Sequence, residues 1–285
     1  MRNVIICECA HGARIAREKL RNLRASLKGA GIACAAVPDL CGMAARKDPL
    51  LARLASDPSA RICACYPRAI RALFEFAGAP LAAPDVQPVD LREAPIEAVL
   101  AGLGIRACLD NGLEDDPSAA PADDGWIPWF PVIDSQRCSQ CQQCLGFCLF
   151  GVYALAADGK VVVQQPMACK TYCPACARIC PQAAIVFPKH EGGSIAGAEI
   201  ADEEKEKNRI QSDRAKVLGS DVYRGLAERR QQARGRQLLR PEVDLARDPS
   251  EPIPERPGST QEGIEPASAA TPGSDPSAAA SSIRP

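Results

Sequence analysis

The first hundred residues alternate short apolar runs with segments of helical periodicity. The apolar runs predict strands at 4–7, 32–37 and 61–65, and helical spacing predicts helices at 14–27, 50–55 and 67–76, with a further strand and helix within 86–103. Pro67 suits the first turn of its helix, and glycines follow the ends of two of the helices. This alternation of strand and helix predicts a small α/β domain with a parallel sheet over residues 1–109.

Three regions of different composition follow this domain. Residues 110–125 are small, acidic and turn-rich, and they predict a linker. Residues 126–190 contain both tryptophans and most of the cysteines. Residues 191–285 contain no cysteine and are dense in charge and then in Pro, Ser and Ala, which predicts a largely disordered tail with one helix at 213–235.

Cysteine usage separates this chain from an ordinary globular domain. Its 285 residues include 15 cysteines but only two histidines, His11 and His190. The N-terminus lacks the apolar run of about 7–15 residues that marks a signal peptide, and no stretch approaches the roughly 18 apolar residues of a membrane span. We therefore expect a cytoplasmic chain without a membrane span, in which clustered cysteines serve as metal ligands. The net charge of −1 does not favour binding to nucleic acid.

Two cysteine runs dominate residues 126–190. The first run is Cys138-x2-Cys141-x2-Cys144-x3-Cys148, and the second is Cys169-x3-Cys173-x2-Cys176-x3-Cys180. Three corresponding pairs are 32 residues apart and the first pair is 31 apart, so the runs are an internal duplication with one residue inserted after Cys169. Asp158-Gly159, between the two halves, is a strong hairpin signal.

The first run has the spacing found in bacterial ferredoxins with two clusters, where the fourth cysteine ligates the other cluster. A short loop with three thiolates can wrap one iron–sulfur cube, and the x3 step directs the fourth thiolate toward the neighbouring cube. This predicts one 4Fe–4S cluster on Cys138, Cys141, Cys144 and Cys180, and a second on Cys148, Cys169, Cys173 and Cys176. Two zinc sites or a set of disulfides are the alternatives, but structural zinc usually draws on paired knuckles, often with histidine.

Residues 131–188 resemble dicluster ferredoxin domains, although Leu149 stands where a proline often follows the fourth cysteine. The resemblance implies one-electron transfer, usually at low potential. The expected fold class is therefore α+β: a dicluster ferredoxin-like domain with a small N-terminal α/β domain and a disordered C-terminal tail. We expect Trp126, Trp129 and Phe130 to cover the cluster domain as core, with a partner-docking patch as the alternative.

The N-terminal domain carries cysteines of its own near the ends of the predicted strands. Cys7 and Cys9 follow the first strand, Cys41 follows the second and Cys65 ends the third. Ligands gather where the carboxyl ends of parallel strands share an edge, so we hypothesise a third cluster on these four residues. The alternative is that they are small buried hydrophobes, as free cysteines often are. Three further cysteines lie in apolar stretches and are expected in the core: Cys34, Cys63 and Cys108.

Residues 1–100 also resemble the N-terminal domain of the flavin-carrying A subunit of heterodisulfide reductase. The resemblance rests on Ile5-Ile6-Cys7-Glu8-Cys9, Leu40-Cys41, Ala64-Cys65-Tyr66-Pro67-Arg68 and Asp90-Leu91-Arg92-Glu93. In that family the domain can hold an iron–sulfur cluster, and the cysteines that match are the same four. No G-x-G-x-x-G loop follows a strand in this sequence, so flavin binding, bifurcation and disulfide reduction are not expected.

The leading functional hypothesis is an electron carrier, rather than an enzyme, that exchanges single electrons with a flavoprotein or a larger oxidoreductase. One alternative is an oxidoreductase subunit with thiol/disulfide or cluster-based redox chemistry at the N-terminal cysteines. Another is a redox-sensing adaptor whose tail binds a partner. A site with four thiolates and no open iron position would argue against the enzyme.

Overall fold

The computed structural model describes residues 3–81, 88–105 and 125–235. Contacts divide the chain into two units, Met1–Asp248 and Pro249–Pro285, and all described residues belong to the first. Within this described part, no helix is long and apolar enough to cross a membrane.

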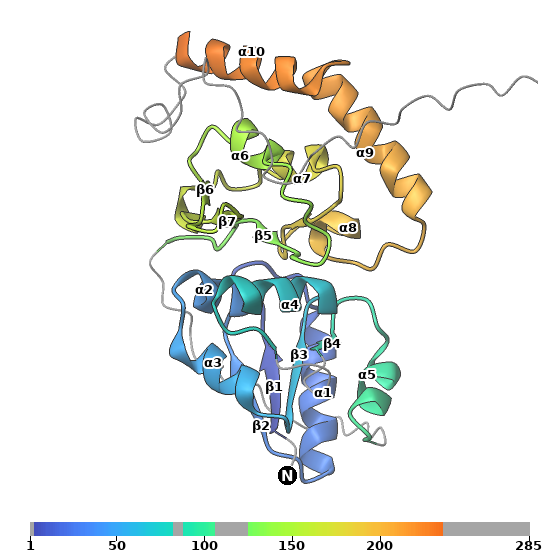
Figure 1. Cartoon of the computed structure of the whole chain (residues 1–285). Helices are drawn as coiled ribbons and strands as arrows, with labels where there is room; N and C mark the ends of the chain where they lie inside the picture. Colours follow the sequence, from blue (N-terminus) through green and yellow to red (C-terminus); the bar gives the residue numbers. More distant parts are fainter. Residues whose placement is uncertain (1–2, 82–87, 106–124, 236–285) are drawn as a thin grey trace, which may run out of the picture. The chain divides into compact units, whose positions relative to one another are not determined.

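The N-terminal residues form a four-stranded parallel sheet (Figure 1). Its strands are β1 (Asn3–Cys7), β2 (Cys34–Val37), β3 (Ala60–Ala64) and β4 (Pro88–Asp90), in the order β2-β1-β3-β4. The predicted α/β domain with a parallel sheet is therefore confirmed in its architecture. The chain passes from β1 to β2 on one side and then crosses to β3 on the other side of β1, so the strand order reverses beside β1. In open α/β sheets, ligands bind at such a reversal.

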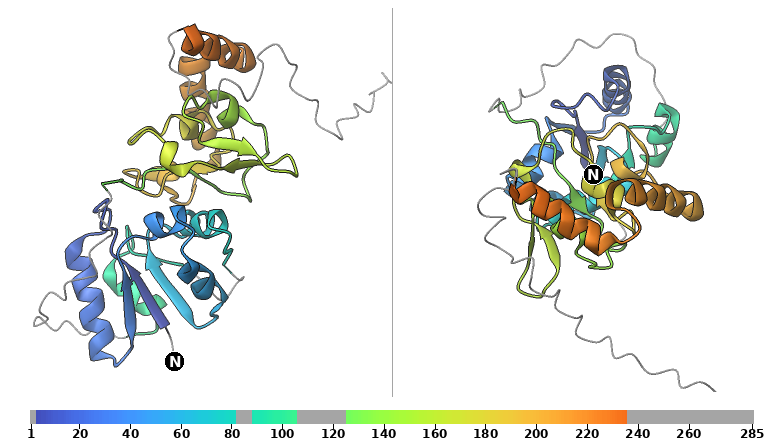
Figure 2. Two further views of the ribbon diagram at one scale, coloured as in Figure 1. Left: turned by 90° about the vertical axis from the view of Figure 1, so that its left-hand side faces the viewer. Right: turned by 90° about the horizontal axis from the view of Figure 1, so that it is seen from above.

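Helices cover both faces of this sheet (Figure 2). They are α1 (Arg17–Gly29), α2 (Leu40–Ala45), α3 (Pro49–Ser56), α4 (Pro67–Phe76) and α5 (Ile96–Gly102). Side chains of β1 alternate between two cores: Val4 and Ile6 pack with α1 and α5, whereas Ile5 and Cys7 pack with α2, α3 and α4. This period of two is what a strand buried on both faces requires.

One short helix of this domain was not predicted. The six residues of α2 are too few to show a helical period, and the helix depends on its cap. The Asp39 carboxylate accepts hydrogen bonds from the backbone amides of Cys41 and Gly42 at 3.0 and 3.3 Å. Among the cysteines predicted in the core, Cys63 is fully buried, the prediction for Cys34 is wrong because its side chain is exposed, and Cys108 lies outside the described residues.

The cysteine-rich segment folds as two short antiparallel ladders with two short helices. In chain order its elements are β5 (Val132–Ile133), α6 (Gln143–Phe147), β6 (Tyr153–Leu155), β7 (Val161–Val163), a 3-10 turn η1 (Pro166–Ala168), α7 (Ala175–Ile179) and β8 (Ile185–Val186). Strand β5 pairs with β8, and β6 pairs with β7 across the predicted Asp158-Gly159 turn. The hairpin is confirmed, and Gly159 supplies the positive φ of 77° that the turn needs.

The duplication read from the cysteine spacing is present in the backbone. Helices α6 and α7 begin and end 32 residues apart. Gln140 and Tyr172, also 32 residues apart, both adopt positive φ, at 58° and 63°. Gly151 and Ala183, three residues after the fourth cysteine of each run, do the same at 70° and 49°. The two halves therefore bend their cysteine loops in the same way.

The sequence predicts a largely disordered tail from residue 191 with a single helix at 213–235. For the residues that the structure describes, up to 235, this prediction is wrong. After α8 (Gly193–Ala196), this segment forms α9 (Glu203–Leu218) and α10 (Val222–Gly235), which contact α7 and α6 (Figure 1). The charge that suggested disorder stabilises α9 instead, because Asp202 caps the helix and three glutamates occupy its first turn. Four apolar residues of α9 and α10 are buried: Ile210, Leu218, Leu226 and Ala233.

The aromatic run at 126–130 divides between two cores. Trp129 packs in the core of the cysteine-rich segment, as expected. Phe130 instead packs with the N-terminal domain, its ring centroid 5.2 Å from that of Phe76, and Trp126 lies against the same core. The expectation that all three cover the cluster domain is therefore wrong for Phe130 and Trp126, since they face the neighbouring α/β domain.

Candidate metal centres

The first group of thiols shares one cavity. It is lined by Ile133, Val161 and Ile185 together with the predicted ligands of the first cluster, Cys138, Cys141, Cys144 and Cys180. Cys138 and Cys141 come from the loop that leads into α6, Cys144 lies in α6, and Cys180 follows the end of α7. The structure thus brings together the four residues that the sequence placed together.

The electrostatic surroundings of these thiols agree with that grouping. Burial raises the pKa of the Cys144 thiol, and Cys180, Cys141 and Cys138 raise it further. Burial also raises the pKa of Cys138 and Cys180, each with Cys141 as a neighbouring thiol. Because metal ligands bind as thiolates, such clustered thiols favour a cation among them that replaces their protons.

The second group joins the other cysteines of the two runs. Burial raises the pKa of Cys169 to about 12, and the next contributions come from Cys148 and Cys173. For Cys176 burial again raises the pKa, with Cys148, Cys144 and Cys169 among the contributing thiols. The inserted residue after Cys169 is absorbed in a turn, where the Cys173 amide donates to the Lys170 carbonyl at 3.1 Å.

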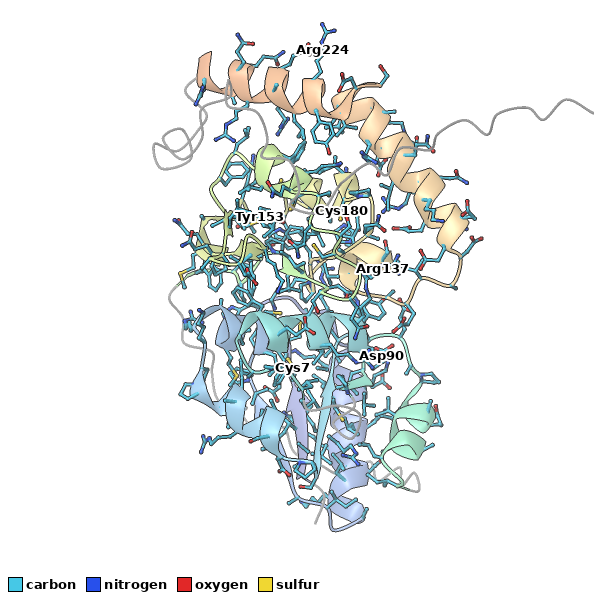
Figure 3. All side chains as sticks on the ribbon, viewed as in Figure 1. Cys7, Asp90, Arg137, Tyr153, Cys180 and Arg224 are labelled. Atoms are coloured by element: carbon cyan, nitrogen blue, oxygen red, sulfur yellow. The ribbon has the colours of Figure 1, made fainter. Side chains whose placement is uncertain are left out.

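The two thiol groups differ in the donor that forms a hydrogen bond to one of their sulfur atoms. The Ala184 amide donates to Cys180 Sγ at 3.4 Å, and the buried Tyr153 hydroxyl donates to Cys176 Sγ at 3.1 Å. Figure 3 places both Tyr153 and Cys180 within the cysteine-rich segment. Such bonds set the potential of iron–sulfur sites, because they stabilise negative charge on sulfur. No sequence signal indicated the role of Tyr153, whose place under the second group follows from the hairpin pairing.

The four N-terminal cysteines also come together. Cys7, Cys9, Cys41 and Cys65 are all buried, with exposures of 3–6%. Each lies at or after the carboxyl end of a strand, at the edge beside the reversal of strand order. The pKa of Cys65 is raised by its hydrogen bond with Cys9 and by burial, and then by the thiols of Cys9, Cys7 and Cys41. The four predicted thiols therefore lie near one another, within the cores that flank the sheet.

Cys9 is distinct within this N-terminal group. The side-chain hydrogen bond with Cys65 lowers the pKa of Cys9 to about 6; burial opposes the shift and the Lys189 ammonium assists it. The backbone of Cys9 adopts a positive φ of 50°, which is uncommon outside glycine. By contrast, burial and then Asp39 raise the pKa of Cys7 to about 12.

An ion pair that the sequence did not reveal lies beside these thiols. Lys189 Nζ is 2.5 Å from Asp39 Oδ2, and their side chains are only 3% and 4% exposed. Asp39 could have been suspected as a helix cap, because it precedes an apolar stretch after Pro38. Lys189 carries no local signal, since only the tertiary fold brings it to residues 150 positions earlier.

Single metal ions are a poorer match for these sites than cubes. Four ligands of one zinc ion must all lie about 2.3 Å from it, whereas those of a cube bind four separate irons and stand further apart. Groups of four thiols without histidine fit the cube.

Comparison with known proteins defines the class of the cysteine-rich segment. Residues 130–211 match the family model of the 4Fe-4S dicluster domain. The segment is therefore a ferredoxin-type dicluster domain, which holds two 4Fe–4S clusters. The match continues beyond the last cysteine into α9, which agrees with the packing of that helix on α7.

A curated relative points the same way. An uncharacterised ferredoxin of Methanocaldococcus jannaschii is 48% identical over 63 residues, a stretch that covers 22% of this chain and 42% of that protein. The chain thus matches less than half the length of this relative. No solved structure matches the chain. Together these matches support a ferredoxin-type iron–sulfur domain in the cysteine-rich segment.

Proposed function

We propose that the whole chain is an electron carrier that passes single electrons to or from a redox protein. A 4Fe–4S cluster supplies a one-electron couple whose potential depends on hydrogen bonds to sulfur and on exposure. The chain's own residues would hold two such clusters, on Cys138, Cys141, Cys144 and Cys180 and on Cys148, Cys169, Cys173 and Cys176.

One observation carries this proposal: the two thiol groups exchange their fourth members. Cys180 of the second run lies with the first group, and Cys148 of the first run lies with the second. The groups also adjoin, because the thiols of both Cys148 and Cys144 raise the pKa of Cys176. Adjacent one-electron sites within one core suit transfer through the domain.

We propose in addition that the N-terminal domain is related to that of the heterodisulfide reductase A subunit and holds a third iron–sulfur cluster. The four thiols at the switch point of a parallel sheet support this proposal, as does their chemistry, which offers four sulfur donors and no histidine. The domain organisation we propose is an α/β domain at 1–109, a linker at 110–125 and a dicluster domain at 126–190 that α9 and α10 extend.

The partner we propose is a flavoprotein or a larger oxidoreductase in the cytoplasm. Two large side chains flanking cysteines of the second group are open to solvent: Met167 is 52% exposed and Tyr172 is 66% exposed. A partner that covered them would come close to Cys169, which lies between them in sequence, and to Cys173, which follows Tyr172. The described cysteines are all free, which suits a reducing compartment.

A second candidate function is thiol chemistry at the N-terminal site. The hydrogen-bonded pair of Cys9 and Cys65, with the lowered pKa of Cys9, favours it. Iron content separates the two functions, because thiol chemistry needs these cysteines free whereas a third cluster occupies all four.

Electron release tests the proposal directly. Protein reduced with dithionite, and then freed of it on an anaerobic column, is mixed with oxidised cytochrome c as a one-electron acceptor. We expect about two or three electrons per chain, one from each cluster. Cys180→Ser should remove about one of them, whereas Cys34→Ser, at an exposed cysteine outside the three groups, should remove none. Protein that releases no electrons to this acceptor would contradict the proposed function.

A further inference from the structure

Lys189 reaches the N-terminal thiols from the dicluster domain, just after its last strand. The backbone carbonyls at and beside Lys189 accept hydrogen bonds from the α/β domain. Arg14 Nε donates to the Lys189 carbonyl at 2.9 Å, and Arg92 donates to the Pro188 carbonyl at 3.2 Å and to the His190 carbonyl at 2.5 Å. These bonds hold the main chain at Lys189 against the α/β domain.

The ammonium group of Lys189 lies against both a carboxylate and a thiol. Its Nζ is 2.5 Å from Asp39 Oδ2 and 3.8 Å from Cys9 Sγ. Gly12 closes over the pair: a Cβ added there would stand 3.2 Å from both Cys9 Sγ and Lys189 Nζ. The charge is therefore enclosed with the thiols rather than shared with solvent.

Asp39 connects this charge to two cysteine-bearing loops. Its carboxylate accepts from the His11 amide at 3.2 Å, in the loop that carries Cys9. It also accepts from the Cys41 amide at 3.0 Å, at the start of α2. The ion pair thus stands between the loops after β1 and β2.

A contribution to folding stability does not by itself explain a buried ion pair of this kind. Removing two charges from water costs about as much as their attraction returns, and apolar replacements are often equally stable. Inside a protein, however, a charge acts strongly on neighbouring charges because the effective dielectric constant is low. The groups that face this ammonium are those of Asp39, Cys9 and Cys41.

We infer that Lys189 is a positioning residue of the N-terminal redox site, which it tunes to a higher potential, and that Asp39 opposes it. This inference rests on the proposed third cluster. One-electron reduction, here by dithionite, adds one negative charge to the site. A cation beside Cys9 stabilises that added charge and an anion destabilises it. The dicluster domain thereby sets the potential of a site built by another domain.

The test is a redox titration of the full, anaerobically reconstituted chain, followed by low-temperature EPR. The signal that Cys65→Ser abolishes identifies the N-terminal site. Lys189→Met should move the midpoint of that signal to lower potential, and Asp39→Asn, which keeps a good helix cap, should move it higher. Lys189→Arg keeps the charge and should stay near wild type, as should Lys160→Met, which removes an exposed lysine from the same domain.

Opposite shifts are the decisive result, because damage to a structural ion pair would not give them. An unmoved midpoint in Lys189→Met, or shifts of the same sign in both variants, overturns the inference. If the Lys189→Met variant does not bind iron, the Asp39→Asn variant alone tests the inference. A midpoint in Asp39→Asn that stays at the wild-type value or falls below it overturns the inference. A wild-type chain with no signal sensitive to Cys65→Ser would overturn the third cluster itself, and the inference with it.

Discussion

At the scale of single residues, the structure separates cysteines that share a site from cysteines that only pack. Cys65 and Cys63 are two residues apart and both are buried, yet they point to different cores. Cys65 lies with three other thiols at the sheet edge, whereas Cys63 packs among apolar side chains. Strand alternation alone would put both side chains on the same face, because they are two residues apart. They differ because Cys65 lies just beyond the end of β3, where the chain leaves the strand.

Substitution of these two cysteines should therefore have different effects on iron content. Cys65→Ser should lower iron by about four atoms per chain, because it removes one ligand of the proposed third cluster. Cys63→Ser is the matched control and should keep wild-type iron with some loss of stability. The measurement is iron and protein quantification on anaerobically purified variants. Equal iron in the two variants would contradict the N-terminal site.

His190 should make stability depend on pH. Burial lowers the pKa of its ring below the ordinary value of 6.5, so the folded state favours the neutral form. The resulting stabilisation is present above pH 6.5 and is lost as pH falls through the lowered value. The thermal midpoint of wild type should fall further than that of His190→Gln between about pH 7.5 and pH 5.5. A parallel decline in the two proteins would count against this assignment.

At the scale of elements, sequence reasoning succeeded where one segment carries its own signal. The 32-residue offset of the cysteines predicted the repeat that α6 and α7 show, and Pro67 predicted the start of α4. It failed for α9 and α10, whose apolar residues are few and gain their burial from the dicluster domain. Leu226 lies 3.8 Å from the position of a Cβ added to Gly146, and the Arg229 guanidinium lies 4.3 Å from the ring centre of Phe147. Such contacts cannot be seen in a charged segment read alone.

The docking of α10 can be tested through its apolar anchor. Leu226→Ala should destabilise the protein by about 2 kcal/mol, because it removes a buried side chain from the contact with α6. Val217→Ala changes a side chain that is 48% exposed and should stay within about 0.5 kcal/mol of wild type. Chemical unfolding of both variants measures the difference. If the two variants were equally stable, α10 would not be held by this contact.

At the scale of the described molecule, the two domains meet through a few buried polar groups. Arg68, in α4, is 7% exposed and bonds to Asp134 at 2.6 Å, to the Ser194 carbonyl at 3.1 Å and to the Ala183 carbonyl. The Ala69 backbone beside it comes so near Gly197 that an added Cβ would stand 2.9 Å from its amide nitrogen. Sequence could predict each domain but not this contact, because its members are 66–128 positions apart.

Loss of Arg68 should therefore weaken the whole described unit. Arg68→Met should cost about 3–5 kcal/mol, because it removes the buried guanidinium that pairs with the Asp134 carboxylate and donates to the carbonyls of 183 and 194. Arg61→Met, at an arginine of the same domain outside this contact, is the control. Unfolding curves of the two variants give the comparison, and a loss below about 1 kcal/mol for Arg68→Met would contradict this role.

The central claim is that this chain holds an electron relay built from three groups of four thiols. The most direct measurement is the count of iron and acid-labile sulfide in anaerobically purified protein, with low-temperature EPR after dithionite reduction. The account predicts about 12 iron and 12 sulfide per chain, four of each for every cluster. About 8 of each would leave the dicluster domain intact but contradict the third site, and zinc in place of iron would contradict the relay altogether.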